Sequence, residues 1–387
     1  MGCPHQILTV FSFLAFFAFG LSIGIIFCIN YKTFSFNLQV TNGQFSIVTA
    51  KLPQELERPP TVPIPIPDET SHSNATESDG DRRREYLDET REMNYAEIFR
   101  RASRILPDSD FREVPKVAFM FLTKGPVILA PLWEEFFKGY RGLYSVYVHC
   151  DPGYNGSEPE GSVFRGRRIH SQRVDWGKVN MVEAERRLLA NALLDSSNQR
   201  FVLLSESCIP LYNFSTVYSY LLNSSQTFVE LYDLPGAVGR GRYNPKMSPT
   251  IRIHQWRKGS QWFAADRRLA IEIISDRTYW PVFRRYCNGS CYADEHYLPT
   301  FVLMREFGRR NANRTLTWVD WSRGGPHPAK FIRTDVTPEF LQRLRAAGEC
   351  EYNGRKGGVC FLFARKFTES TLTRLLRFAP RVMMFDR

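Results

Sequence analysis

Acidic residues are in short supply in this sequence. The 387 residues include 40 Asp and Glu against 51 Lys and Arg, so the formal net charge is +11 and the isoelectric point is near 9.3. Such a balance suggests a polyanionic partner, for example nucleic acid, anionic lipid or a phosphorylated ligand. Hydrophobic residues make up 43% of the chain and charged residues 24%, which excludes wholesale disorder.

Charged side chains are absent from residues 7–29, where Phe, Leu, Ile and Ala dominate. A helix of this length spans about 30 Å of hydrocarbon. The run is longer than the apolar region of a signal peptide, and no Ala-x-Ala cleavage site follows it, so an uncleaved anchor is favoured over a cleaved signal peptide. We therefore predict a short cytoplasmic tail at 1–6 and a transmembrane signal anchor at 7–29.

Glycosylation sequons and cysteines indicate that the rest of the chain lies in the secretory lumen. The sequons are Asn74, Asn155, Asn213, Asn223, Asn288 and Asn313. Six of the eight cysteines follow the anchor: Cys150, Cys208, Cys287, Cys291, Cys350 and Cys360. This even number is compatible with disulfides, whose pairing the sequence leaves open. A type II membrane protein with a luminal domain follows, and in that compartment nucleic acid is not expected as a partner.

Composition divides the luminal part into a stem and a domain. Residues 30–112 are rich in Pro, Ser and charged residues and lack apolar periodicity, as expected for a stem. Residues 113–387 alternate short apolar runs with amphipathic segments, which predicts an α/β domain with a mostly parallel sheet. The predicted strands are 117–122, 143–149, 167–174, 201–205, 227–232, 316–319 and 359–364. The predicted helices are 126–138, 178–194, 215–222, 265–275, 294–306 and 338–347.

Two groups of polar residues lie where such a fold places its ligands. His149 and Asp151 end the second predicted strand, at the edge where open α/β sheets bind nucleotides. Asp151-Pro152-Gly153 is also good turn chemistry, and both roles stay open. Asp294 and Glu295 begin a predicted helix, where a positioned carboxylate can accept a proton from a bound hydroxyl. The alternative is that they only stabilise the start of the helix.

Basic residues bracket the last predicted strand. Arg355 and Lys356 precede it, and Arg365 and Lys366 follow it. Arg and Lys together suit a diphosphate, since Arg provides a bidentate fork and Lys a compact charge. Ordinary charged strand flanks are the alternative.

Metal-binding patterns are scarce. Asp-x-Asp, a carboxylate pair that holds a metal–nucleotide complex, occurs only at Asp79/Asp81 and Asp108/Asp110, in or beside the stem. A nucleotide diphosphate in the domain is therefore expected to be neutralised by Lys and Arg, with no divalent metal. Cys287 and Cys291 near His296 allow a zinc interpretation, but a luminal disulfide is favoured.

Several segments together resemble the core-2/I-branching β-1,6-N-acetylglucosaminyltransferase-like family, which includes the peptide O-xylosyltransferases, and its plant branch above all. The resemblance covers about residues 117–377. It rests on residues 147–151, 171–177, 203–210, 256–263, 294–296, 318–321 and 363–367, in this order and spacing.

The resemblance implies a GT-A-like fold, a UDP-sugar donor, and inverting, metal-independent transfer to a glycan or glycoprotein by a type II protein of the Golgi membrane. Glu295 matches the catalytic base and Lys366 the residue that holds the UDP diphosphate. Asp151 and its strand match the uridine-contacting edge, and the segment that contains Trp262 flanks the acceptor cleft. Gly357 replaces a second diphosphate-binding Arg, for which Arg355 and Lys356 are the candidate substitutes.

The resemblance also bears on the disulfides and on the donor. The spacing of Cys350 and Cys360 resembles one family disulfide, and the donor sugar is expected to be GlcNAc or xylose-like. The rival hypothesis is a catalytically inactive luminal protein that binds carbohydrate, or serves as a scaffold, on the same fold.

Overall fold

The computed structural model of the protein describes residues 95–105 and 114–385. The predicted tail, the predicted anchor at 7–29, Asn74 and most of the predicted stem lie outside the described residues. Within the described ranges, no helix is long and apolar enough to cross a membrane.

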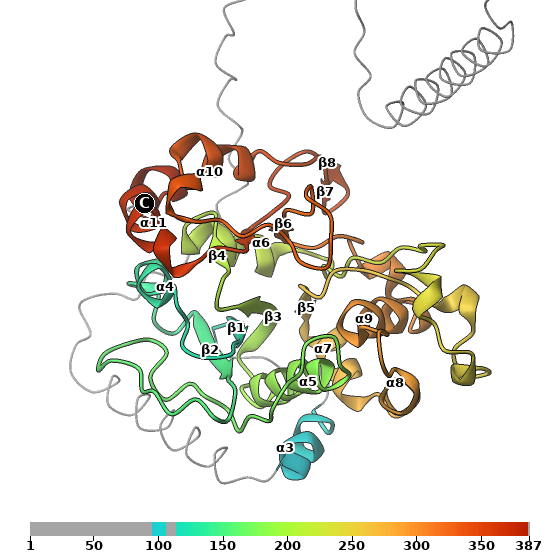
Figure 1. The fold of residues 1–387 in the computed structure, drawn as a ribbon. Helices are drawn as coiled ribbons and strands as arrows, with labels where there is room; N and C mark the ends of the chain where they lie inside the picture. Colours follow the sequence, from blue (N-terminus) through green and yellow to red (C-terminus); the bar gives the residue numbers. More distant parts are fainter. Residues whose placement is uncertain (1–94, 106–113, 386–387) are drawn as a thin grey trace, which may run out of the picture. The chain divides into compact units, whose positions relative to one another are not determined.

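The central sheet is mostly parallel, as predicted (Figure 1). Its strands are β1 (Lys116–Leu122), β2 (Tyr144–His149), β3 (Asn198–Ser205) and β5 (Ala264–Asp266), in the order β2-β1-β3-β5. β1 pairs in parallel with β2 and β3, and β5 runs antiparallel to β3. The five middle residues of β1 are buried on both faces, which explains why this strand reads as a continuous apolar run.

Alternate residues of β1 face two separate hydrophobic cores. Phe119 and Phe121 join Trp133 of α4 (Ala130–Phe137) in one core. Ala118 and Met120 join α5 (Asn180–Leu193) in the other. This alternation is the two-residue period of a strand, and it gives the domain helices on both faces of its sheet. The other α-helices are α3 (Tyr95–Ala102), α6 (Phe214–Asn223), α7 (Arg267–Ser275), α8 (Tyr279–Tyr286), α9 (Ala293–Met304), α10 (Pro338–Arg345) and α11 (Leu372–Phe378).

A second, smaller sheet extends the domain. β9 (Phe363–Arg365) pairs antiparallel with β4 (Ile209–Pro210) and parallel with β6 (Thr317–Val319). A separate hairpin joins β7 (Glu351–Tyr352) to β8 (Arg355–Lys356). Sequence analysis predicted β6, and it predicted a longer strand at 359–364 in place of β9.

Two predicted strands are wrong. Residues 167–174 make one isolated bridge, between Arg168 and Val148, and beyond it the Gln172 amide donates to the His149 ring instead of to a strand. Residues 227–232 make isolated bridges to three different partners, at residues 264, 311 and 258, so no continuous ladder forms.

Helix α3 belongs to the folded domain, which therefore begins before the predicted boundary at residue 113. Ile98 and Ala102 are buried in the core that contains α5. The Arg187 guanidinium of α5 lies 3.4 Å from the centre of the Tyr95 ring, a cation–π contact. Residues 95–102 thus form a packed helix within the segment predicted as stem.

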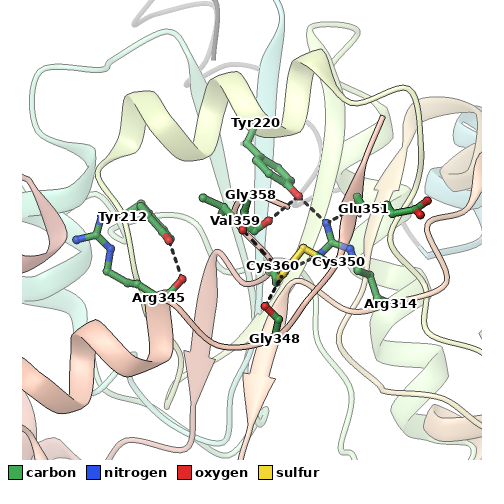
Figure 2. The surroundings of a disulfide bond; sticks show 10 residues. All are labelled: Tyr212, Tyr220, Arg314, Arg345, Gly348, Cys350, Glu351, Gly358, Val359 and Cys360. Carbon is green, nitrogen blue, oxygen red and sulfur yellow. Dashed lines mark hydrogen bonds between the residues drawn. A yellow bond between two sulfur atoms is a disulfide. The ribbon is translucent and has the colours of Figure 1, made fainter. Parts of the chain in front are cut away.

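Two disulfides link cysteines that are close in sequence, Cys287–Cys291 and Cys350–Cys360. The first confirms the disulfide interpretation over zinc, and the second confirms the pair that the family resemblance implied. Cys150 and Cys208 are buried free thiols. Figure 2 shows the second disulfide beside Tyr220 of α6, whose hydroxyl donates to the Val359 carbonyl.

Four of the sequon asparagines, Asn155, Asn223, Asn288 and Asn313, are exposed. Asn213 is instead buried, and its side-chain oxygen accepts a hydrogen bond from the Thr216 amide at the start of α6. Burial and the N-cap role are unfavourable for a glycan, and Asn213 as a glycosylation site stays a prediction.

We therefore expect Asn213→Ala to destabilise the domain by about 0.5–2 kcal/mol, the usual cost of losing an N-cap, without changing its mobility on a gel. Ser215→Ala is the matched control, because it removes the sequon and leaves the cap in place. Denaturant unfolding and electrophoresis measure the two effects. A loss of one glycan in Ser215→Ala would contradict the assignment.

Candidate active site

A cleft of about 1040 Å³ lies at the carboxyl ends of the parallel strands. Lys124 follows β1, His149 ends β2 and Glu206 follows β3, and all three residues line the cleft. Lys366 follows β9 of the second sheet and lines the same cleft. The site is therefore built where open α/β sheets bind their ligands.

His149 and Asp151 both line the cleft, and both also hold the local chain in place. The Asp151 carboxylate accepts a hydrogen bond from the Gly153 amide at 2.8 Å, so the predicted turn is present. The buried His149 ring accepts from the Gln172 amide at 3.2 Å. Burial, with the nearby charge of Arg187, lowers the pKa of His149 to about 4, so its imidazole is neutral at physiological pH.

Positive charge gathers at one part of the cleft. Burial and the neighbouring Arg365 lower the pKa of Lys366, and the charges of Lys330 and Lys124 act in the same direction. Glu206 opposes them. Like charges held together in this way are stabilised by a bound anion, because the anion relieves their mutual repulsion.

Trp262 lies against one of the cations in this part of the cleft, Arg365. The Arg365 guanidinium lies 4.0 Å from the centre of the Trp262 ring, and both side chains line the cleft. The ring stabilises the cation through its negative face and fixes its position.

Arg355 and Lys356 lie elsewhere. Both are exposed on β8, and neither lines the cleft. Their hairpin is tied to the disulfide Cys350–Cys360 and to α6, since the Tyr352 hydroxyl donates to the Tyr220 carbonyl. The expectation that one of them replaces the second diphosphate-binding Arg is therefore not supported by their position, whereas Arg365 and Lys124 both line the cleft with Lys366.

The backbone around α9 fixes Asp294 and Glu295 in the first turn of that helix. Tyr292, just before the helix, has a left-handed conformation with φ of 52°. Gly259 donates its amide to the Glu295 carbonyl at 2.9 Å. A Cβ atom on Gly259 would lie 1.8 Å from the Glu230 carbonyl oxygen, so only glycine allows this close approach.

The Glu295 carboxylate is held through one of its two oxygens. Its Oε2 accepts hydrogen bonds from Arg242 Nη1 at 2.5 Å and from Lys258 Nζ at 2.6 Å. None of the residues that the structure describes donates to Oε1. Burial on its own raises the pKa of Glu295, but Lys258 and Arg242 outweigh it and hold the pKa below its usual value. Glu295 is thus an ionised carboxylate with one oxygen available to a ligand.

Asp294 has a different environment. Burial, with the adjacent charge of Glu295, raises the pKa of Asp294 to about 6. Its Oδ1 is buried and has no hydrogen-bond partner among the described residues. A buried acceptor without a partner is unusual in a native protein, and Asp294 lines the cleft, so it can accept a hydrogen bond from a bound hydroxyl.

The structure therefore brings together His149, Asp151, Trp262, Asp294, Glu295, Arg365 and Lys366. Sequence analysis did not name Arg242 and Lys258 as partners of Glu295. Lys258 lies within a segment that carried the family resemblance, so a signal was present. Arg242 ends a short 3-10 helix, η1 (Arg240–Arg242), in a region without periodicity, and only the fold places it beside α9.

Replacing Lys258 by methionine is expected to move the acidic limb of the pH–rate profile to higher pH. The loss of the ammonium group removes the larger of the two charges that lower the pKa of Glu295, so burial raises that pKa against Arg242 alone, and a base must be deprotonated to act. The measurement is kcat/KM from pH 4 to 8, with the exposed Lys246→Met as the matched control. An unchanged acidic limb would show that Lys258 does not set the ionisation of Glu295.

Comparison with known proteins gives one matching family and one similar protein. The family described as Core-2/I-Branching enzyme matches residues 117–345. The chain is 34% identical over 306 residues to Glycosyltransferase BC10 of Oryza sativa subsp. japonica, a match that covers 67% of this chain and 76% of that protein. The chain therefore belongs to the core-2/I-branching enzyme family and is a glycosyltransferase.

Proposed function

We propose that the protein transfers a sugar from a UDP-sugar to a hydroxyl group of a glycan or glycoprotein, by an inverting mechanism that needs no divalent metal. The observation that carries the proposal is the arrangement of one cleft. It combines a carboxylate with a free oxygen, Glu295, and a cluster of cations around Lys366.

The chemistry is a single displacement at the anomeric carbon. Glu295 Oε1 takes the proton of the acceptor hydroxyl as the hydroxyl oxygen forms its bond to the anomeric carbon. The bond between that carbon and the UDP oxygen breaks on the opposite side, which inverts the configuration. The negative charge that develops on the departing UDP is stabilised by Lys366 and Arg365. Asp294 and Trp262 line the same cleft, where Asp294 Oδ1 accepts a hydrogen bond from a sugar hydroxyl and Trp262 flanks the acceptor.

The proposal includes the membrane topology and the compartment of the protein. The charge-free segment 7–29 supports a single anchor of a type II protein, and the exposed sequons and the two disulfides support a luminal domain in the Golgi. Sensitivity of the native full-length protein to an endoglycosidase tests the luminal orientation, and resistance would count against it.

The central test is release of UDP by the full-length protein across a panel of UDP-sugars, including UDP-GlcNAc and UDP-xylose, with and without glycan acceptors and in excess EDTA. We expect acceptor-dependent UDP release from one donor, unaffected by EDTA. A strict manganese requirement would contradict the metal-free mechanism. UDP binding without transfer from any donor would favour the inactive carbohydrate-binding protein.

A further inference from the structure

A disulfide joins the end of α8 to the start of α9, the helix that carries the base. Cys287 follows the last residue of α8, and its amide donates to the Phe283 carbonyl at 2.8 Å. Cys291, the other half of the disulfide, directly precedes Tyr292 at the start of α9. Both cysteines are buried and neither lines the cleft, so the disulfide takes no direct part in the chemistry.

The disulfide holds the backbone from which Glu295 projects. Tyr292 has a left-handed conformation, which is uncommon for a residue with a side chain and has to be held by its surroundings. The Tyr292 carbonyl accepts the Glu295 amide at 3.0 Å, so the conformation of Tyr292 sets the direction of the first turn of α9. Because Cys291 is bonded to Cys287, the residue just before Tyr292 is fixed to the end of α8.

The end of α8 is also bonded to the segment that carries Arg242. The carbonyl of Tyr286, the last residue of α8, accepts a hydrogen bond from Asn244 Nδ2 at 2.9 Å. Asn244 lies two residues after Arg242, which donates to Glu295. The Arg242 guanidinium also lies 4.1 Å from the centre of the Tyr292 ring. Arg242 is therefore connected both to α8 and to the residue that follows the disulfide.

Aromatic stacking connects α8 to the segment that carries Lys258. The Trp256 ring stacks on Phe283 of α8 and on His296 of α9, with ring centres 5.3 and 4.5 Å apart. His296 Nδ1 donates to the Arg257 carbonyl at 2.7 Å, next to Lys258 in the chain. The end of α8 is thus the place where the backbone of the base and the segments of both its cations are held together.

Global stability is a weak reason for a crosslink at this place. A disulfide stabilises a fold mainly by restricting the unfolded chain, and the effect becomes smaller as the closed loop becomes shorter. Cys287 and Cys291 are only four residues apart, against ten for Cys350 and Cys360. The position of the first disulfide, directly before the helix turn that carries Glu295, points instead to a local effect on the native state.

We propose that the disulfide Cys287–Cys291 positions the base: it fixes the first turn of α9 to α8, so that Glu295 Oε2 stays on Arg242 and Lys258 while Oε1 stays available to the acceptor hydroxyl. The inference rests on the proposed function and deepens it by naming two positioning residues that touch no substrate. Because Lys366 and Arg365 belong to a different sheet, loss of this disulfide is expected to disturb the base and to spare the UDP site.

Hydrogen exchange without substrate tests the positioning apart from turnover, so its failure is distinct from failure of the proposed function. The full-length Cys287→Ala/Cys291→Ala variant is compared with the wild type and with Cys350→Ala/Cys360→Ala, which removes the disulfide beside the hairpin. The amide of Glu295, and that of Gly259, which donates to the Glu295 carbonyl, should exchange about tenfold faster or more in the first variant alone. Equal exchange of these amides in all three proteins overturns the proposal, whatever the transfer assay shows.

The transfer assay tests the consequence for catalysis. We expect Cys287→Ala/Cys291→Ala to lower kcat on the order of 10²-fold, the usual effect of displacing a reacting group by about 1 Å, with the Kd of UDP unchanged. The acidic limb of the pH–rate profile should move to higher pH. A Glu295 that Lys258 and Arg242 hold less closely loses part of the positive charge that lowers its pKa, and a base must be deprotonated to act.

The control variant separates positioning from a general structural role. Cys350→Ala/Cys360→Ala should keep the wild-type acidic limb and kcat. An unchanged kcat and acidic limb in Cys287→Ala/Cys291→Ala would contradict the proposal, and so would a loss of UDP affinity as large as the loss of kcat. If thermal unfolding shows that Cys287→Ala/Cys291→Ala does not fold, a phosphine reductant on folded Cys350→Ala/Cys360→Ala breaks the same bond, a gain of thiols confirms it, and the same shift of the acidic limb is expected.

Discussion

Glu295→Gln is expected to lower the rate of sugar transfer by a factor of about 10²–10⁴, the usual contribution of a general base, while affinity for UDP stays unchanged. Glutamine keeps the size of the side chain and a carbonyl oxygen for Arg242 and Lys258, but it cannot take the proton of the acceptor hydroxyl. The measurement is kcat for transfer together with the Kd of UDP, both on the full-length protein.

Glu135→Gln is the matched control for this prediction. Glu135 lies on α4, is exposed and, among the described residues, forms an ion pair only with Lys138 at 3.4 Å, so its replacement should leave both kcat and the Kd of UDP unchanged. Transfer at the full rate by Glu295→Gln would remove Glu295 from the mechanism. A loss of UDP binding in the same variant would indicate that the cleft itself is disturbed and that the rate change has another origin.

The elements that the sequence predicts well are those whose burial is decided locally. β1 is apolar from Val117 to Leu122 because both of its faces are covered, so its pattern has a single explanation. The apolar residues of α5 recur at helical spacing and predict the helix, although its polar residues Glu185, Arg186 and Arg187 are buried as well. The predicted strand at 167–174 fails for the opposite reason. Its residues have strand-like composition, but the partner that would complete a ladder is replaced by the His149 ring, which no local pattern reveals.

The site residues divide in the same way, into those that the local sequence reveals and those that only the fold brings to the site. Glu295 and Lys366 could be recognised because each ends or begins an element and matches a family segment. Arg355 and Lys356 were candidates because they stand near β9 in sequence, and the disulfide and the contact of Tyr352 with Tyr220 hold their hairpin outside the cleft. Arg242 could not be found at all, since 53 residues separate it from Glu295 and the fold alone brings the two together.

The net charge of +11 takes on a more specific meaning in the structure. A small group of cations around Lys366 lines or borders the cleft, and two further cations, Arg242 and Lys258, hold the base. The two groups differ in how their positive charge is balanced. The cations around Lys366 repel one another and are stabilised by an anionic ligand, whereas Arg242 and Lys258 are already neutralised in part by Glu295. Only the first is therefore expected to bind a phosphate-containing donor.

Lys366→Met is accordingly expected to weaken UDP binding by about 10- to 100-fold, the value of a hydrogen bond to a charged group. The same change should leave the melting temperature of the ligand-free protein unchanged or higher. Burial and Arg365 lower the pKa of Lys366, so the folded state holds this charge less favourably than the unfolded chain does, and removing the charge relieves that cost.

Calorimetry gives the affinity for UDP, and thermal unfolding with and without UDP gives the stability. Saturating UDP at about 100 times Kd stabilises a protein by about 2.7 kcal/mol, so the shift in melting temperature should be large in the wild type and small in Lys366→Met at the same UDP concentration. The exposed Lys246→Met should behave as the wild type in both measurements. Unchanged UDP affinity in Lys366→Met would place the diphosphate elsewhere in the cleft, whereas weaker binding with equal or greater stability would show that this lysine is kept for the ligand at the expense of the fold.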